Sequence, residues 1–284
     1  MKARRVSALA AAAALAGVGL YLSAMRPGHD AWRVRADAAA QPEERSRLLA
    51  EVRQSCRLED LDRFLAEQRG AAETEPGNGV HWRVLAEAYL ERAQFHGLRK
   101  ALRVGRPLYT ELPEGLEEDV ERGLELLERA RALGDLGSES YRIEAGLLCC
   151  LITGLPSALR LDGRATAALE RARELDEANP RVQVAMGCRV LFAPPLLGHD
   201  ARRGRDHLRA GAAGLPFDER PLIFAAWAYH LLDEPEEARR LLTEAIARTP
   251  ANPFAPEALR RLEAGEEDPF RQVSGQREAI SEER

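Results

Sequence analysis

The sequence predicts an all-α protein built from repeated helical hairpins, and three observations support this class. Ala, Leu, Arg and Glu dominate the 284 residues, whereas aromatic residues make up only 5%. The dominant residues lose little side-chain freedom in a helix. Apolar residues recur at helical spacing along most of the chain. Small and large residues return at matching places in successive segments, as in stacked repeats.

The first 25 residues predict export. Lys2, Arg4 and Arg5 precede an uncharged run from Val6 to Met25. This pattern fits either a cleaved signal peptide or a single retained membrane anchor. The basic residues in front of the run place the following chain outside the cytoplasm in both cases. We therefore expect a protein of the bacterial periplasm or cell envelope that meets the membrane only through this segment.

The rest of the chain divides at composition breaks such as Glu75-Pro76-Gly77-Asn78-Gly79. The expected parts are a linker at 26–41, an N-terminal helical segment at 42–78, repeats at 79–137, 138–179, 180–218 and 219–250, a capping helix at 251–264 and a flexible tail at 265–284. An insertion at 98–115 separates the two helices of the first repeat.

The repeat at 219–250 has the most regular pattern. Its small and large positions fall on Leu222, Ala225, Ala226, Tyr229, Ala238, Leu242 and Ala245, with a closing Pro250. Small residues at these places let two helices approach closely, while large ones fill the space beside them. In this spacing the chain resembles the tetratricopeptide repeat (TPR) family, which implies a solenoid of helical hairpins.

The other units follow the same pattern less regularly. Trp82, Leu85, Ala86 and Tyr89 fit the first helix of unit 79–137, and Gly187, Gly204, Leu208 and Gly211 fit unit 180–218. The turn from Pro194 to Asp200 is similar to one in exported bacterial TPR proteins, such as the T component associated with TRAP transporters. The chain lacks the cysteine after the apolar run that is usual in that group.

No motif in the sequence predicts catalysis, a cofactor or a metal. His199, Asp200 and His207 form the one cluster of metal-ligand types. On one helix the two histidines would lie about 12 Å apart, too far to share an ion. Asp200 instead suits a helix start. The net charge of −5, without a basic block, argues against nucleic acid as a partner. We expect a protein that is not an enzyme.

The four cysteines do not have the spacing of a metal site. Cys149 and Cys150 are adjacent, and a bond between them would be strained. Either could bond to Cys188 in an oxidising compartment, or all could be small buried thiols.

The first helix of each TPR hairpin lines the inner groove of the solenoid, so the resemblance implies which residues face it. These residues are Arg142, Arg181, Val184, Cys188, Leu191, Phe192, Arg220, Ile223, Trp227 and His230. They predict an apolar groove edged by arginines, which could bind a carboxylate or a phosphate. The groove could be open, or it could be filled by the chain's own N-terminal helices, insertion or tail.

The predicted function is a scaffold that binds a protein or peptide partner through this groove, with apolar side chains as anchors and arginines as a clamp. The alternative is a component of a transport system in the cell envelope that binds an apolar or acidic small ligand or a lipid. The sequence does not indicate an oligomeric state.

Overall fold

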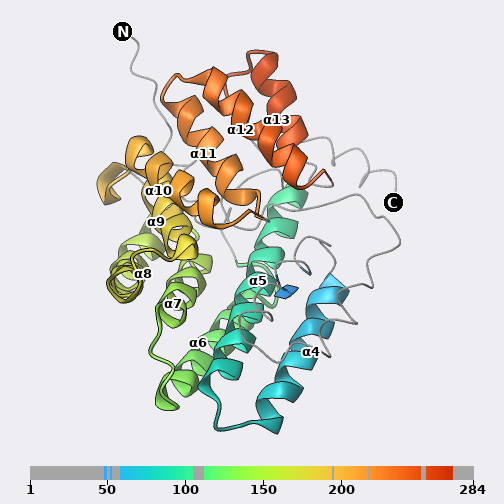
Figure 1. The fold of residues 1–284 in the computed structure, drawn as a ribbon, viewed down its shortest axis with the longest axis vertical. Coiled ribbons are helices and arrows are strands. Elements are labelled where there is room, and N and C mark those ends of the chain that lie inside the picture. Colours follow the sequence, from blue (N-terminus) through green and yellow to red (C-terminus); the bar gives the residue numbers. More distant parts are fainter. Residues whose placement is uncertain are drawn as a thin grey trace.

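The computed structural model describes Leu48, Leu49, Val52 and residues 58–104, 112–193, 195–216, 218–250 and 254–270, with only the backbone at 95–104. Within these ranges the chain forms ten α-helices and one 3₁₀ turn, Pro195–Leu197, and no strand, so the predicted all-α class is confirmed (Figure 1). The predicted signal or anchor and the linker at 26–41 lie outside the described residues. None of the helices described here is long and apolar enough to span a membrane.

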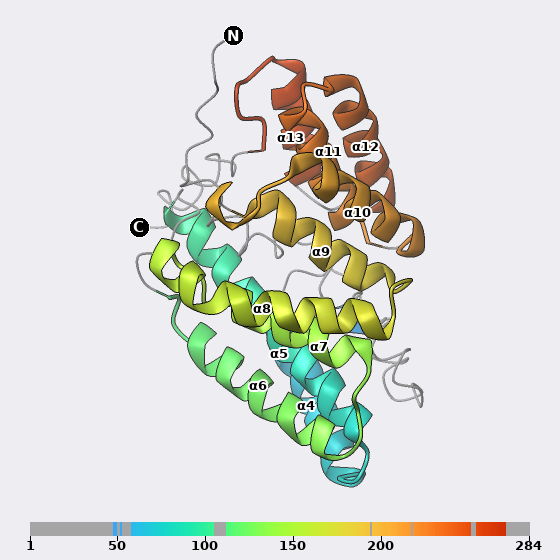
Figure 2. The same ribbon diagram turned by 90° about the vertical axis from the view of Figure 1, so that its left-hand side faces the viewer.

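Eight of the helices pair into four successive hairpins. The pairs are α5 (Gly79–Val104) with α6 (Leu116–Ala132), α7 (Ser138–Cys150) with α8 (Leu155–Leu175), α9 (Pro180–Phe192) with α10 (Ala201–Gly214), and α11 (Arg220–Leu231) with α12 (Pro235–Arg248). Figure 2 shows the hairpins following one another along the long axis. Because α5, α7, α9 and α11 also pack in sequence against one another, they form one continuous layer.

Single helices cover the two ends of the stack. Helix α4 (Leu58–Thr74) packs on α5, and α13 (Phe254–Glu263) packs on α12 (Figure 1). Phe64 of α4 is fully buried in the same core cluster as Trp82 and Tyr89 of α5. Leu48, Leu49 and Val52 belong to this cluster as well, so the N-terminal region contributes to the core of the first hairpin.

Several helices begin at side chains that satisfy free backbone N–H groups. The Asn179 Oδ1 atom accepts hydrogen bonds from the backbone N–H groups of Arg181 (2.9 Å) and Val182 (3.3 Å). Asp200 Oδ1 accepts one from the N–H of Arg203 at 3.0 Å, which confirms the helix start predicted there. These caps replace hydrogen bonds that the first turn of a helix cannot make internally.

The small residues of the repeat pattern lie where paired helices touch. Ala225, Ala226, Ala238 and Ala245 have no exposed surface and pack between α11 and α12. In the preceding hairpin, a Cβ atom added to Gly187 would lie 2.6 Å from Leu208 Cγ. A larger residue therefore cannot fit there without moving α10 away from α9.

The first hairpin differs from the expectation for residues 98–115. Helix α5 continues without interruption to Val104, so residues 98–104 extend the first helix rather than forming part of an insertion. The helix formers in this stretch, such as Leu98, Lys100 and Ala101, favour that continuation. Residues 105–111 lie outside the described part of the chain.

Candidate functional site

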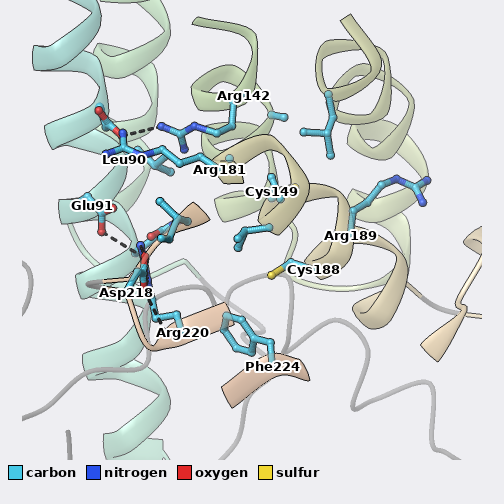
Figure 3. Close-up of a pocket in the computed structure, with 18 of the residues that line it drawn as sticks. Leu90, Glu91, Arg142, Cys149, Arg181, Cys188, Arg189, Asp218, Arg220 and Phe224 are labelled. Atoms are coloured by element: carbon cyan, nitrogen blue, oxygen red, sulfur yellow. Dashed lines mark hydrogen bonds and ion pairs between the residues drawn. The ribbon is translucent and has the colours of Figure 1, made fainter. Parts of the chain in front are cut away.

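A cavity of about 350 Å³ lies on the inner layer of the solenoid, between the first helices of the hairpins (Figure 3). Helices α5, α7, α8, α9 and α11, the last residue of α10 (Gly214), and Leu215, Pro216 and Asp218 contribute to its wall. Its apolar lining consists of Leu49, Leu90, Ala145, Gly146, Cys149, Ala165, Leu169, Val184, Ala185, Cys188, Leu215 and Phe224. The volume lies at the lower end of the range of ligand-binding pockets.

One polar part of the wall is an ion-pair cluster built from α5, α7 and α9. Glu87 accepts hydrogen bonds from Arg142 at 2.6 Å and from Arg181 at 3.0 Å. Glu139 accepts from Arg142 at 2.9 Å and from the side-chain amide of Asn179 at 2.8 Å. The cluster ties the first helices of three successive hairpins together, although Glu87 and Arg181 are far apart in the sequence.

The carboxyl group of Glu139 is held in its charged form. Burial opposes its ionisation, but the charges of Arg142 and Arg181, with the hydrogen bonds from Arg142 and Asn179, outweigh that effect and lower its pKa to about 2. The carboxylates of Glu139 and Glu87 raise the pKa of Arg142 against the opposing effect of burial. The two arginines are therefore neutralised by carboxylates of this chain.

A second ion pair joins the last hairpin to the first across the cavity. Arg220, at the start of α11, contacts Asp218 at 2.8 Å and Glu91 of α5 at 3.8 Å (Figure 3). The Arg220 and Glu91 side chains are only 13% and 10% exposed, so the contact is shielded from water. It joins the start of α11 to α5 at the cavity.

A third arginine pair forms the opposite part of the wall. Arg189 donates hydrogen bonds to Asp162 at 2.8 Å and to the Thr166 hydroxyl at 2.7 Å. On α5, Gln94 is 6% exposed, and its Oε1 atom has no hydrogen-bond partner among the described residues. A buried acceptor without a partner is costly, and it suits a bound group that can donate a hydrogen bond.

The structure brings together half of the residues that the sequence analysis assigned to the groove. Arg142, Arg181, Val184, Cys188 and Arg220 line the cavity. Val184 and Cys188 contribute to its apolar side, and the three arginines to its polar side. Whether these residues contact a partner stays a prediction.

Three other predicted groove residues lie in the core. Leu191, Phe192 and Ile223 are only 2–3% exposed. Phe192 packs edge-on against Phe224, with ring centroids 5.3 Å apart, because α11 folds closely onto α9. Their side chains are therefore part of the core, which is the alternative that the sequence analysis gave for a filled groove.

The last two predicted residues, Trp227 and His230, lie beyond the cavity and meet the chain's own C-terminal region. Phe270 stacks on Trp227 with ring centroids 5.6 Å apart and an interplanar angle of 3°. The Phe270 and His230 ring centroids are 5.8 Å apart. At this end the groove is thus filled by the segment that follows α13, one of the occupants that the sequence left open.

Sequence reasoning missed the contribution of α5. Glu87, Leu90, Glu91 and Gln94 all line the cavity from this helix. Counting from Gly79, the first three fall on the same inner positions as Trp227, His230 and Leu231 in the last repeat. Applying that register to the first unit would therefore have found them.

The cavity thiols are free; Cys188 is buried and Cys149 is half-buried. Cys149 and Cys188 line the cavity, and they and Cys150 are not in disulfides. Burial raises the pKa of Cys149 and of Cys188 to about 12, and it raises that of Cys150 as well. At neutral pH these groups are protonated and behave as small apolar side chains.

The histidine cluster at 199–207 takes structural roles. Asp200 caps α10, and His207 Nδ1 lies 2.7 Å from the Gln183 side-chain oxygen. Burial, with the nearby charge of Arg203, lowers the pKa of His207. Over the described ranges, no three His, Cys, Asp or Glu side chains gather in a way that could hold a metal ion.

The arrangement defines an all-α solenoid of TPR type, and solved structures agree with this class. The thermophilic TPR protein TTC0263 from Thermus thermophilus is similar, with a TM-score of 0.53 at 15% identity, over 79% of this chain and 100% of that chain. At this identity the likeness shows the fold alone.

Two further solved structures have lower TM-scores. YrrB, described as a TPR protein with an unusual peptide-binding site, gives 0.39 at 16% identity over 82% of this chain and 100% of that chain. The APC/C heterotetramer Cut9–Hcn1 gives 0.42 at 16% identity, over 82% of this chain and 46% of that chain. No protein-family model and no curated protein matches the sequence.

Proposed function

We propose that the chain is a binding scaffold that takes a peptide segment of a protein partner on its inner surface. The cavity of about 350 Å³ carries this proposal, because it combines an apolar floor with paired arginines on the layer that TPR-type solenoids present as a concave surface. An apolar side chain of the partner would enter between Val184, Ala185 and Leu90. Its burial would supply most of the affinity.

The arginines would then decide which partners fit. Arg181 is 28% exposed, whereas Arg142 and Arg220 are 12% and 13% exposed. A carboxylate of the partner would therefore meet Arg181 first, and it could form a forked contact with that guanidinium group. Because the arginines already have carboxylate partners, we expect their contribution to favour selectivity over affinity.

The test is a peptide library selected against the full chain, followed by affinity measurements on two variants. Ala185→Phe places a ring in the cavity, and Ala213→Phe makes the same change at an exposed position of α10. We expect the selected peptides to bind Ala213→Phe like the unaltered chain and Ala185→Phe at least tenfold more weakly. Equal affinity for all three proteins would show that the cavity is not the binding site.

The second candidate function is binding of a small amphipathic molecule or lipid, as part of a transport system. The unpartnered Oε1 atom of Gln94 favours it, because a buried acceptor beside an apolar cavity suits a ligand with one donor group. Native mass spectrometry of the freshly purified chain distinguishes the candidates. A small adduct that disappears in Ala185→Phe supports this function, whereas a mass without adducts argues for the peptide.

We also propose that the protein acts outside the cytoplasm and by binding rather than catalysis. The basic start and the uncharged run from Val6 to Met25 support export. Cell fractionation of the tagged chain tests it, and recovery in the cytoplasm would contradict it. The ion-paired carboxylates and protonated thiols of the cavity support binding. A Cys149→Ser/Cys188→Ser variant should therefore keep its partner.

A further inference from the structure

The segment after α13 returns to the inner layer and occupies part of it. Helix α13 ends at Glu263, and Gly265 in the following turn reverses the chain with a φ of 69°. The N–H of Glu266 donates to the Arg261 carbonyl at 3.0 Å. This is a helix ending that glycine favours. The reversal brings residues 266–270 back against α11, where Phe270 is 2% exposed.

The rings of Trp227 and His230 receive Phe270, and the buried ring of Phe192 packs against Trp227. These three residues are here called the Trp227 platform. Trp227 contacts Phe192 on one side, with ring centroids 5.0 Å apart, and stacks with Phe270 on the other. His230 Nε2 lies 3.3 Å from the Glu267 carbonyl oxygen, so the neutral ring in one tautomer, or the protonated ring, donates a hydrogen bond to the segment backbone. The platform therefore contacts both the side chain and the backbone of its occupant.

The exposure of the side chains in residues 267–270 indicates which of them the platform would recognise. Pro269 and Phe270 are buried, whereas Glu267 and Asp268 are exposed to solvent. Aromatic stacking and apolar burial stabilise the contact, and the charges face water. A matching ligand is thus defined by a proline followed by a phenylalanine, and not by its acidic residues.

We infer that the Trp227 platform is a binding site for an extended peptide that carries a Pro-Phe pair, and that residues 266–270 are its occupant within the same chain. This inference rests on the proposed function in one respect, since both place a peptide on the inner layer. It adds two points: the partner segment carries a Pro-Phe pair, and residues 266–270 of the same chain compete with it. A partner segment binds only when it displaces Phe270, so the tail lowers the apparent affinity for the partner.

The test measures binding of a labelled, C-terminally amidated peptide AGEEDPF, the sequence of residues 264–270, by fluorescence anisotropy. The proteins are the full chain, Phe270→Ala, and Phe270→Ala combined with Trp227→Ala. A tethered segment competes at an effective concentration near the millimolar range. We therefore expect Phe270→Ala to bind the peptide about tenfold more tightly than the unaltered chain, and the double variant to lose this gain.

A second variant leaves every platform side chain in place. Gly265→Ala meets no atom within 4 Å, but its positive φ strains any residue other than glycine and loosens the return of the tail. Peptide affinity should rise several-fold in this variant too, and circular dichroism should show unchanged helix content in all variants. If peptide binding is absent in Phe270→Ala and in Gly265→Ala while helix content is kept, the inference is wrong.

Two altered peptides test the assigned chemistry. AGEEDPA should not bind Phe270→Ala, whereas AGSSSPF should bind it within about twofold of the original peptide. The reverse result, with binding governed by the acidic residues, would overturn the inference. Ala185→Phe should leave binding of AGEEDPF to Phe270→Ala unchanged. Failure at the platform is therefore distinguishable from failure of the cavity to bind a partner.

Discussion

Replacing Gly187 with alanine should destabilise the protein, although alanine is the better helix former. An added Cβ would lie 2.6 Å from Leu208 Cγ and 3.0 Å from two backbone atoms of α10, the Gly204 oxygen and the Leu208 nitrogen. The backbone atoms cannot move aside without separating α9 from α10. Overpacking of this kind costs about 1–3 kcal/mol.

The matched control is Gly163→Ala. Gly163 is exposed within α8, and an added Cβ there would meet nothing within 4 Å. Without a steric cost, the helix preference of alanine should stabilise the protein by about 0.5–1 kcal/mol. The same preference offsets part of the strain at Gly187, so we expect a net loss of about 1–2 kcal/mol there.

Thermal unfolding followed by far-ultraviolet circular dichroism gives the comparison. A change of 1 kcal/mol shifts the Tm by about 2–4 °C for a chain of this size. Gly187→Ala should lower the Tm while Gly163→Ala raises it. If both variants gain stability, α9 and α10 do not approach as closely as the repeat register and the structure place them.

Three further predictions concern the cavity wall. Because the pKa of Glu139 falls from 4.5 to about 2 on folding, its contribution is fully present above pH 4.5 and is lost as pH falls toward 2. Urea unfolding should show that Glu139→Gln lowers the free energy of unfolding by up to about 3 kcal/mol at pH 7 and leaves it nearly unchanged near pH 2. Burial raises the pKa of Cys149 and Cys188 to about 12, so few of these thiols are ionised at pH 8.5. Because the thiolate is the reactive form, their alkylation should be about a thousandfold slower in the native chain than in urea. Equal rates in both conditions would show that the thiols are exposed. Arg220→Gln should lower the free energy of unfolding by about 2 kcal/mol, because Glu91 and Asp218 lose their charge partner, and no change in the urea midpoint would contradict this.

Local pattern was enough to predict the class of fold and the close helix pairs. The register of small residues identified Ala225, Ala238 and Gly187, because the spacing along one helix sets which side faces its neighbour. The groove positions implied by the resemblance to TPR proteins selected Arg142 and Arg181, which line the cavity. The predictions from small residues need only the geometry of a single hairpin.

Contacts that depend on the curvature of the whole solenoid could not be predicted in this way. Glu91 and Arg220 meet only because the last hairpin curves back toward the first, and no spacing in the sequence encodes that distance. Phe270 lies in a polar segment without helical periodicity, so its burial against Trp227 has no local signal. The sequence left open whether Leu191 and Ile223 face an open groove or lie in the core, because curvature also decides which apolar residues become core.

The central claim is that a peptide binds in the cavity on the inner layer, and photo-cross-linking tests it most directly. A benzophenone side chain is placed at position 185 in the cavity wall, and in a second protein at position 213 on the exposed face of α10. A peptide selected against the unaltered chain is then irradiated with each protein. We predict cross-links from position 185 and none from position 213. Cross-links from position 213 alone, or equal yields from both, would contradict the claim.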